Sequence, residues 1–524
     1  MQGAKGIFFL GTMAIKTALL PLFLGASSGI AQNLSDTHIN TTIPEFTPLT
    51  YYSHQWRNSL RRLDHDSADL MGLPFPYATP TLKGNQLFQE MYYWDSYFIN
   101  RGLLAYGTHP QRSGESTADE LAALQQAIHN VNNLLFLVKK LGFVPNANRY
   151  SMTNRSQPPL LGAMVADLYR ATRDTAWLRQ ALPLLEKEHD WWMQARSLGL
   201  TQREQTIAPN ALAYNHYGHN ASNAFLLRFG RFLSGRLDEG FDSLLRRENQ
   251  DSLFLPAETG VPASKQGKGI QLLGHLLAEA ESGWDFTPRF NARCQNMAAL
   301  DLNCLLYITE NTLFEGYKSL RDARKAKLWK SIAKKRKKLI NNLFYDKHTG
   351  WYWDYDIALG KISTINSAAQ FMPYFANIAP HNRKHAKALL SLSELFIGRY
   401  GVHPCLPVLA DSIQQSQNRV WWSTQWNSPN AWPPLTHFVA QGLLRYSDQP
   451  FQSKTQRALA EKRYALIQGF LQSVETQFIL TGKFWEKYNL HTGALDVTNE
   501  YAMPDFFGWT AGVYVEYRLE FVGP

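Results

Sequence analysis

The chain has 524 residues, 45% of them hydrophobic and 13% aromatic, and carries a formal net charge of +10. A chain of this length can bury a sizeable core, although length alone does not separate one large domain from several small ones. A disulfide-rich scaffold is excluded, because only Cys294, Cys304 and Cys405 occur and they lack metal-ligand spacing. We expect buried thiols, with a Cys294–Cys304 pair as the alternative.

The first 31 residues have the pattern of a signal peptide. Lys5 and Lys16 precede the apolar stretch TALLPLFLGASSGIA at 17–31, and a start at Met13 would leave a complete signal. This stretch is too short and too interrupted to span a bilayer stably. We therefore expect a periplasmic or secreted protein that is not stably inserted in a membrane.

The following elements are mainly helical. Residues 32–86 form a proline-rich, irregular N-terminal lead-in. Apolar residues then recur with helical spacing in ten segments, and GWYWDYD at 350–356 is the best strand and hairpin signal. Helices paired in series with polar loops between them favour an all-α toroid of helical hairpins. The ten predicted helices are 118–140, 160–172, 176–196, 268–281, 297–320, 323–344, 384–398, 431–446, 453–478 and 506–519.

Two segments stand apart from this pattern. Residues 235–268 are polar and irregular, which is typical of a functional or disordered loop insertion. Residues 321–344 are rich in lysine and arginine, with Leu328, Ile332, Leu339 and Ile340 at roughly helical spacing. An amphipathic helix with a solvated basic face explains this run better than nucleic-acid binding, for which no motif is present.

Three carboxylic acids lie among large aromatic rings. Asp95 falls in LFQEMYYWDSYFINRGLL at 87–104, Asp285 in AEAESGWDFTPRF at 278–290, and Glu486 in KFWEKYNLHTG at 483–493. Burial beside such rings raises the pKa of a carboxyl, so that one acid can stay protonated while another is ionised. Glycoside hydrolysis requires such a pair, although each residue alone would more often be a structural carboxylate.

Seven blocks together resemble the trehalase family, in the order that the family has them. They span about residues 80 to 515, and no single block is specific by itself. The blocks are FQEMYYWDSYF (88–98), VPNANRYSMTNRSQPP (144–159), ESGWDF (281–286), DLNCLLY (301–307), QWNSPNAWPP (425–434), EKY (486–488) and EYAMPDFFGWTAGV (500–513).

The resemblance implies a single (α/α)6-barrel domain over 87–524 and inverting hydrolysis of α,α-trehalose to two glucose molecules. It makes Asp285 the general acid and Glu486 the general base. Glu90, Tyr92 and Tyr93 are expected to support the pocket from behind or to fill the core. The substrate-binding residues that it implies are Phe88, Trp94, Asp95, Asn146, Arg155, Gln157, Arg246, Glu248, Gly283, Trp426, Trp432 and Glu500.

Several positions depart from the family pattern. Leu87 stands where the family has an arginine, for which Lys83 is a candidate substitute, and Asn427 replaces an aspartate. Arg246 and Glu248 lie in RREN at 246–249, the nearest match to the family's Arg-Pro-Glu-Ser block. The local alignment is poor, and GHNAS at 218–222 is a competing match to the same block. These changes leave two alternatives open: the same carboxyl pair acting on another α-glucoside, and a sugar-binding protein with weak or lost catalysis. We expect a monomer with a small sugar as its partner and neither a cofactor nor a metal.

Overall fold

The computed structural model describes residues 47–109, 117–207, 213–234, 263–406, 424–448 and 453–521. The predicted signal peptide at 1–31 lies outside these ranges. The same holds for Arg246 and Glu248 and for most of the predicted insertion at 235–268, of which 263–268 belong to a helix.

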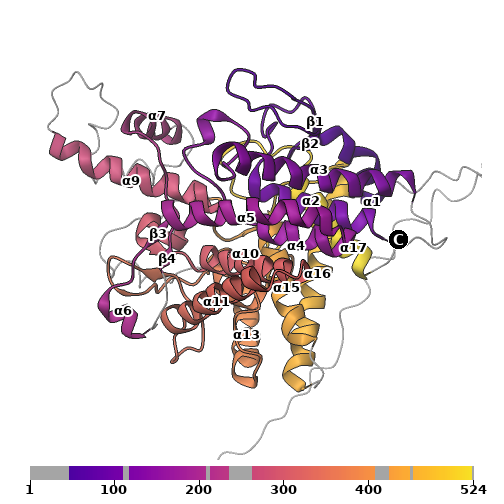
Figure 1. The fold of residues 1–524 in the computed structure, drawn as a ribbon. Helices are drawn as coiled ribbons and strands as arrows, with labels where there is room; N and C mark the ends of the chain where they lie inside the picture. The colour runs from indigo at the N-terminus through magenta and orange to yellow at the C-terminus, as the bar shows by residue number, and fades with distance from the viewer. Residues whose placement is uncertain are drawn as a thin grey trace, which may run out of the picture. The chain divides into compact units, whose positions relative to one another are not determined.

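Six helices form a closed inner ring; five of them are labelled in Figure 1, all but α12. Each contacts the next in chain order, and the last returns to contact the first. They are α2 (Tyr93–Gly107), α4 (Leu161–Thr172), α10 (Leu300–Ser319), the single turn α12 (Met372–Phe375), α15 (Pro433–Ser447) and α17 (Gly508–Phe521).

A second set of helices covers this ring and alternates with it along the chain. For example, α3 packs on α2 and α4, α5 on α4 and α10, and α16 on α15 and α17. The fold is therefore an (α/α)6 barrel, as predicted. The outer helices are α1 (Pro48–Gln55), α3 (Ala118–Leu141), α5 (Thr175–Ala195), α11 (Ala323–Leu339), α13 (Arg383–Phe396) and α16 (Lys454–Thr481).

Local sequence fixes where the outer helices begin and end. A capping box of Thr117 with Glu120 starts α3, and one of Ser453 with Gln456 starts α16. Both helices stop at a glycine with left-handed backbone, Gly142 at φ 93° and Gly482 at φ 69°. Each of these glycines begins a loop that leads into the next inner helix.

The strands are two-residue antiparallel pairs between such loops. They are β1 (Leu60–Arg61) with β2 (Tyr77–Ala78), β3 (Ser197–Leu198) with β4 (Tyr214–Asn215), and β8 (Asn430–Ala431) with β9 (Tyr488–Asn489). A third strand is added in β5 (Met297–Ala298), β6 (Tyr355–Asp356) and β7 (Lys361–Ile362). Within the predicted strand at 350–356, the last two residues form β6, which pairs with β7 in a hairpin.

Each of the ten helices predicted from periodicity corresponds to an observed one. Missing from the prediction are α1, α2, α6 (Gln202–Ile207), α7 (Asn223–Ser234) and α12. The lead-in at 32–86 is accordingly not irregular throughout, because Thr47 caps α1 and Pro48 occupies its first turn. Between α5 and α10 in the chain, α7 packs on α9 (Ala263–Ser282).

The basic segment is an amphipathic helix, α11, but its buried stripe differs from the predicted one. Leu328 is 54% exposed, whereas Ala326, Trp329, Ala333 and Leu339 are buried. All three cysteines are buried free thiols. Within the described part of the chain, no helix is both long enough and apolar enough to cross a membrane.

Candidate active site

A cavity of about 470 Å³ opens where outer helices end and inner helices begin. Its walls come from the segments before α2, α4, α10, α15 and α17, which are far apart in sequence. The cavity is lined by every predicted site residue that lies in the described ranges. These are Phe88, Trp94, Asp95, Asn146, Arg155, Gln157, Gly283, Asp285, Trp426, Trp432, Glu486 and Glu500.

Asp285 follows the end of α9 and has the properties of a proton donor. Burial raises its pKa to about 7, with Glu486 adding to the rise and Arg155 opposing it. Just before it, Gly283 has φ +75°, and a β-carbon there would come within 3.0 Å of the Trp94 ring. The close approach of this glycine to α2 therefore brings Asp285 to the pocket.

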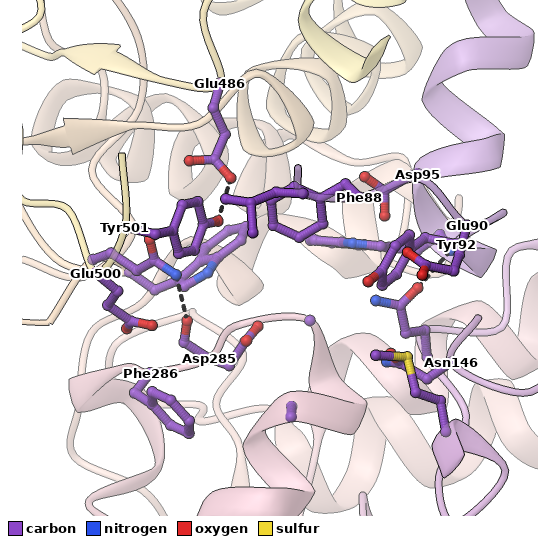
Figure 2. A pocket seen from close by; sticks show the side chains of 18 of the residues that line it. Phe88, Glu90, Tyr92, Asp95, Asn146, Asp285, Phe286, Glu486, Glu500 and Tyr501 are labelled. Carbon is purple, nitrogen blue, oxygen red and sulfur yellow. Dashed lines mark hydrogen bonds between the residues drawn. The ribbon is translucent and has the colours of Figure 1, made fainter. Parts of the chain in front are cut away.

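Glu486 enters the cavity from the opposite side (Figure 2). Its Oε2 accepts a hydrogen bond of 2.7 Å from Lys487 Nζ, and its Oε1 accepts one of 2.5 Å from the Tyr501 hydroxyl. The Trp509 indole donates to its backbone carbonyl at 2.8 Å. An ammonium and a hydroxyl thus hold this buried carboxyl in place, facing the cavity.

Asp95 is the third carboxyl of the pocket and lies in the first turn of α2. Burial raises its pKa well above the ordinary value, and Glu486 and Asp285 raise it further. The adjacent backbone N–H of Trp94 donates to Gln157 Oε1 at 3.1 Å, which joins α2 to the loop before α4.

That loop, at 142–160, supplies the polar wall of the cavity. Arg155 donates to Asn154 Oδ1 at 2.9 Å and to Asn146 Oδ1 at 3.5 Å. Its buried Nε has no hydrogen-bond partner. A buried guanidinium N–H without a partner is uncommon in proteins and marks this arginine as a candidate functional residue.

Aromatic rings form the rest of the wall. The rings of Trp426 and Trp432 stack with centroids 4.0 Å apart and 2° between their planes, and Trp284 stacks on Trp426 at 5.6 Å. Phe88 contacts Tyr501 edge-on at 5.4 Å and has the unusual backbone φ of +57°. A non-glycine residue in this region is uncommon and marks a constrained site.

Two expectations about neighbouring residues are corrected. Glu90 and Tyr92 line the cavity instead of supporting it from behind; Arg149 donates to Glu90 Oε1 from Nε at 3.0 Å. Tyr93 is a core residue, as expected, and its hydroxyl donates to Glu188 at 2.5 Å. Lys83 is not part of the cavity wall, whereas Leu87 is.

Sequence reasoning missed several wall residues. Those within the quoted blocks could have been found there, whereas Phe229 and Phe232 gave no signal because α7 was not predicted. The residues missed are Gln86, Arg149, Met152, Phe229, Phe232, Ala280, Phe286, Gln425, Tyr501, Phe507 and Trp509. In the described residues, no group of three or more His, Cys, Asp or Glu side chains could hold a metal ion.

Comparison with known proteins identifies the family of this chain. A sequence profile described as Trehalase matches residues 30–230 and 236–523. The chain belongs to the trehalase family. Among its relatives, the periplasmic trehalase of Xanthomonas oryzae pv. oryzae is 30% identical over 469 residues, which are 87% of this chain and 70% of the relative. A periplasmic trehalase of Escherichia coli is 28% identical, over 93% of this chain and 74% of the relative.

Solved structures similar to this trehalase-family chain support the barrel fold. Neutral trehalase from Saccharomyces cerevisiae has a TM-score of 0.59 at 23% identity, covering 84% of this chain and 73% of that one. A GH63 mannosylglycerate hydrolase from Thermus thermophilus, solved with glucose, has a TM-score of 0.52 at 17% identity, covering 90% and 98%. At these identities the likeness concerns the fold alone.

Proposed function

We propose that the protein is a periplasmic trehalase that hydrolyses α,α-trehalose to two glucose molecules with inversion. The observation that carries the proposal is one cavity that both carboxyls enter: burial raises the pKa of Asp285 to about 7, and Glu486 accepts hydrogen bonds from Lys487 and Tyr501. The choice of trehalose as the substrate rests on family membership and on the names of the relatives. The cavity volume of about 470 Å³ falls in the usual range for small-molecule sites.

In the proposed reaction, Asp285 donates its proton to the glycosidic oxygen as the bond from that oxygen to the anomeric carbon breaks. Glu486 accepts a proton from a water whose oxygen attacks the same carbon from the opposite face. Solvent then returns a proton from Glu486 to Asp285 for the next turnover. An inverting pair must stand about 6.5–9.5 Å apart to admit this water.

The remaining wall residues would hold the two sugars. Asp95, Asn146, Arg155 and Gln157 offer hydrogen-bonding groups to hydroxyls, and the free Nε of Arg155 supports this role. Trp426, Trp432 and Phe88 would face the C–H surfaces of the rings. Glu500 would act from the loop between α16 and α17. For Arg246 and Glu248 the binding role rests on the sequence resemblance alone.

One observation favours a second candidate, an α-glucosidase for a different glucoside. Leu87 lines the cavity at the position where the family pattern has an arginine, and Phe229 and Phe232 add apolar surface. Losing a charge-assisted hydrogen bond to a hydroxyl costs about 1.5–3 kcal/mol, or roughly ten- to a hundredfold in affinity. A panel of α-linked disaccharides separates the two, since trehalase activity requires the highest kcat/KM for trehalose.

Proton NMR of freshly mixed protein and trehalose is the decisive test. Before mutarotation, inversion yields α- and β-glucose in equal amounts, because only the attacked sugar changes configuration. Asp285→Asn protein is the matched control for a contaminating glucosidase. Folded wild-type protein that releases no glucose would overturn the proposal and favour another α-glucoside or sugar binding without catalysis.

Export and oligomeric state are tested separately. We propose that residues 1–31 are removed on export, so N-terminal sequencing of the mature periplasmic protein should begin near Gln32. We also propose a monomer as the active form. Light scattering at working concentration should give a mass close to that of a single chain.

A further inference from the structure

A lysine lies directly behind the pocket wall. Lys487 follows Glu486 in the chain, its side chain is fully buried, and it does not line the cavity. An isolated ammonium is very unfavourable in a protein interior unless partners compensate for its lost hydration. The function of Lys487 therefore follows from the groups that surround its Nζ atom.

These groups belong to the site itself. Lys487 Nζ donates to Glu486 Oε2 at 2.7 Å and to Gln425 Oε1 at 3.3 Å. It also lies 4.7 Å from the centre of the Trp432 ring and 5.6 Å from that of Tyr501. Two acceptors and two aromatic faces thus hold the ammonium, and the charge-assisted bond to Glu486 is the shortest of these contacts.

Gln425 extends the contact toward the acid. Its Nε2 donates to the backbone carbonyl of Asp285 at 3.0 Å, and the backbone carbonyl of Gln425 accepts from the Trp432 indole at 3.0 Å. A continuous chain of hydrogen bonds therefore runs from Glu486 through Lys487 and Gln425 to the backbone of Asp285. The strand pair β8–β9 sets the register of the two segments, with Ala431 opposite Tyr488.

The charges around Glu486 show why such a cation is needed. Asp95 faces it from α2 and Asp285 from the segment after α9, and each carboxyl interacts electrostatically with it. Tyr501 contributes a hydroxyl from the segment before α17. Within the described residues, Lys487 is the cation in direct contact with Glu486. Any negative charge that Asp285 or Asp95 acquires repels the Glu486 carboxylate, and the adjacent ammonium offsets this repulsion.

We propose that Lys487 is a positioning residue for the general base. It holds the Glu486 carboxylate ionised and, through Gln425, fixes it relative to the segment that bears Asp285. The inference rests on the proposed function in one respect, namely that Glu486 is the base. Because Lys487 does not touch the substrate, it acts on the turnover rate and its pH dependence and leaves substrate affinity unchanged.

The test is the pH profile of kcat in four variants. Lys487→Met should lower kcat about tenfold or more with KM changed less than about threefold, since positioned bases contribute roughly 10²–10⁴. In this variant the acid limb of the kcat–pH profile should move up by about one pH unit or more, which narrows the bell-shaped profile. Lys487→Arg keeps the charge and should retain the wild-type acid limb. Lys483→Met is the matched control, because Lys483 lies on the same loop, partly exposed, 3.7 Å from Asp505.

Lys487→Gln keeps the proposal falsifiable if the methionine variant does not fold. Glutamine can still donate a hydrogen bond to Glu486, which favours folding, but it carries no positive charge. The acid limb should therefore shift in the same direction as in Lys487→Met. An acid limb that stays at its wild-type position in folded Lys487→Met or Lys487→Gln would overturn the inference, whatever happens to kcat. Wild-type protein with no activity on any α-glucoside is a different result, which overturns the proposed function and this inference with it.

The bridge through Gln425 has a test of its own. Gln425→Met removes the hydrogen bonds to Lys487 and to the Asp285 carbonyl. If the two residues act as one unit, kcat of Gln425→Met/Lys487→Met should be close to that of the weaker single variant, because effects within a network do not add. Fully multiplicative losses would show that Gln425 and Lys487 act independently and would overturn this part of the inference.

Discussion

Asp285 illustrates how much of the proposed chemistry depends on the surroundings of single residues. An exposed aspartate would be ionised at neutral pH, but burial raises the pKa of this one to about 7. Below that pH the carboxyl holds its proton and can protonate a leaving group, and above it the proton is lost. We therefore expect kcat to fall as pH rises through about 7.

This alkaline limb is measurable as the upper side of the kcat–pH profile. Below about pH 7, Asp285→Asn should reduce kcat by about 10²–10⁴, because an amide cannot donate the proton, and the alkaline limb should disappear. A profile that stays flat from pH 6 to 9 would contradict the assignment of Asp285 as the acid. The same variant should still bind trehalose in calorimetry, since its wall contacts are preserved.

Gly283 gives a second prediction at this scale. A β-carbon there would lie 3.0 Å from the Trp94 ring, and its φ of +75° disfavours any L side chain. Gly283→Ala should destabilise the fold by about 1–3 kcal/mol and lower kcat/KM through displacement of Asp285 or Trp94. Urea unfolding and steady-state kinetics measure the two effects. A variant with wild-type stability and kinetics would show that this close approach does not set the site.

At the scale of elements, hydrogen bonds join the last turn of α9 to three other segments of the chain. Glu281 accepts hydrogen bonds from Arg196 Nε at 2.8 Å and Nη2 at 3.0 Å, from the Ser156 N–H at 2.8 Å and from the Gly218 N–H at 2.6 Å. It thereby ties the loop bearing Arg155 to the helix that precedes Asp285.

We expect Glu281→Gln to be strongly destabilising. The amide leaves the buried Arg196 charge unpaired, a loss of about 3–5 kcal/mol. Glu315→Gln is the control, because Glu315 is 51% exposed and its pair with Lys318 is worth less than about 1 kcal/mol. Denaturant unfolding at pH 7 compares them; equal stabilities would contradict the role given to Glu281.

Comparing the helices shows which of them could be predicted from the sequence and which could not. Long one-sided helices such as α3 and α16 were found because their period and caps are local signals. The helix α2 was missed because it is buried on nearly all sides and so has no polar face to alternate with its apolar one. In α11, Leu328 matched the expected period, yet the neighbouring helices cover the stripe through Trp329 instead.

The site shows the same division. Asp285, Glu486 and the other predicted residues that line the cavity could be named from the sequence because each stands in a recognisable block. Contacts between blocks could not be predicted from the sequence. The hydrogen bond from Lys487 to Gln425, for example, joins residues that are 62 positions apart. Nothing local in the sequence tells whether a lysine beside a carboxylate points to it or to solvent. Likewise, the exposure of Phe229 and Phe232 to the cavity depends on a helix that carried no clear signal.

The whole molecule depends on closure of the inner ring between α2 and α17, whose sequences are about 400 residues apart. Their backbones meet at glycines: a β-carbon on Gly102 would stand 2.5 Å from Gly512 Cα. Arg101 reinforces the junction by donating to Glu516 on α17 at 2.5 Å and to Asp167 on α4 at 2.7 Å. Because α2 carries Trp94 and Asp95 while Glu486 precedes α17, this junction also brings the two sides of the cavity together.

Gly102→Ala should therefore weaken the whole barrel and not one loop. The added methyl group forces the two helices apart, and overpacking of this kind costs about 1–3 kcal/mol. Unfolding should remain one cooperative transition with a lower midpoint, and kcat/KM should fall because both sides of the cavity move. Gly199→Ala is the control, since a β-carbon there meets nothing within 4 Å. If both variants unfold at the wild-type midpoint, the ring is not closed as tightly at this junction as the helix contacts imply.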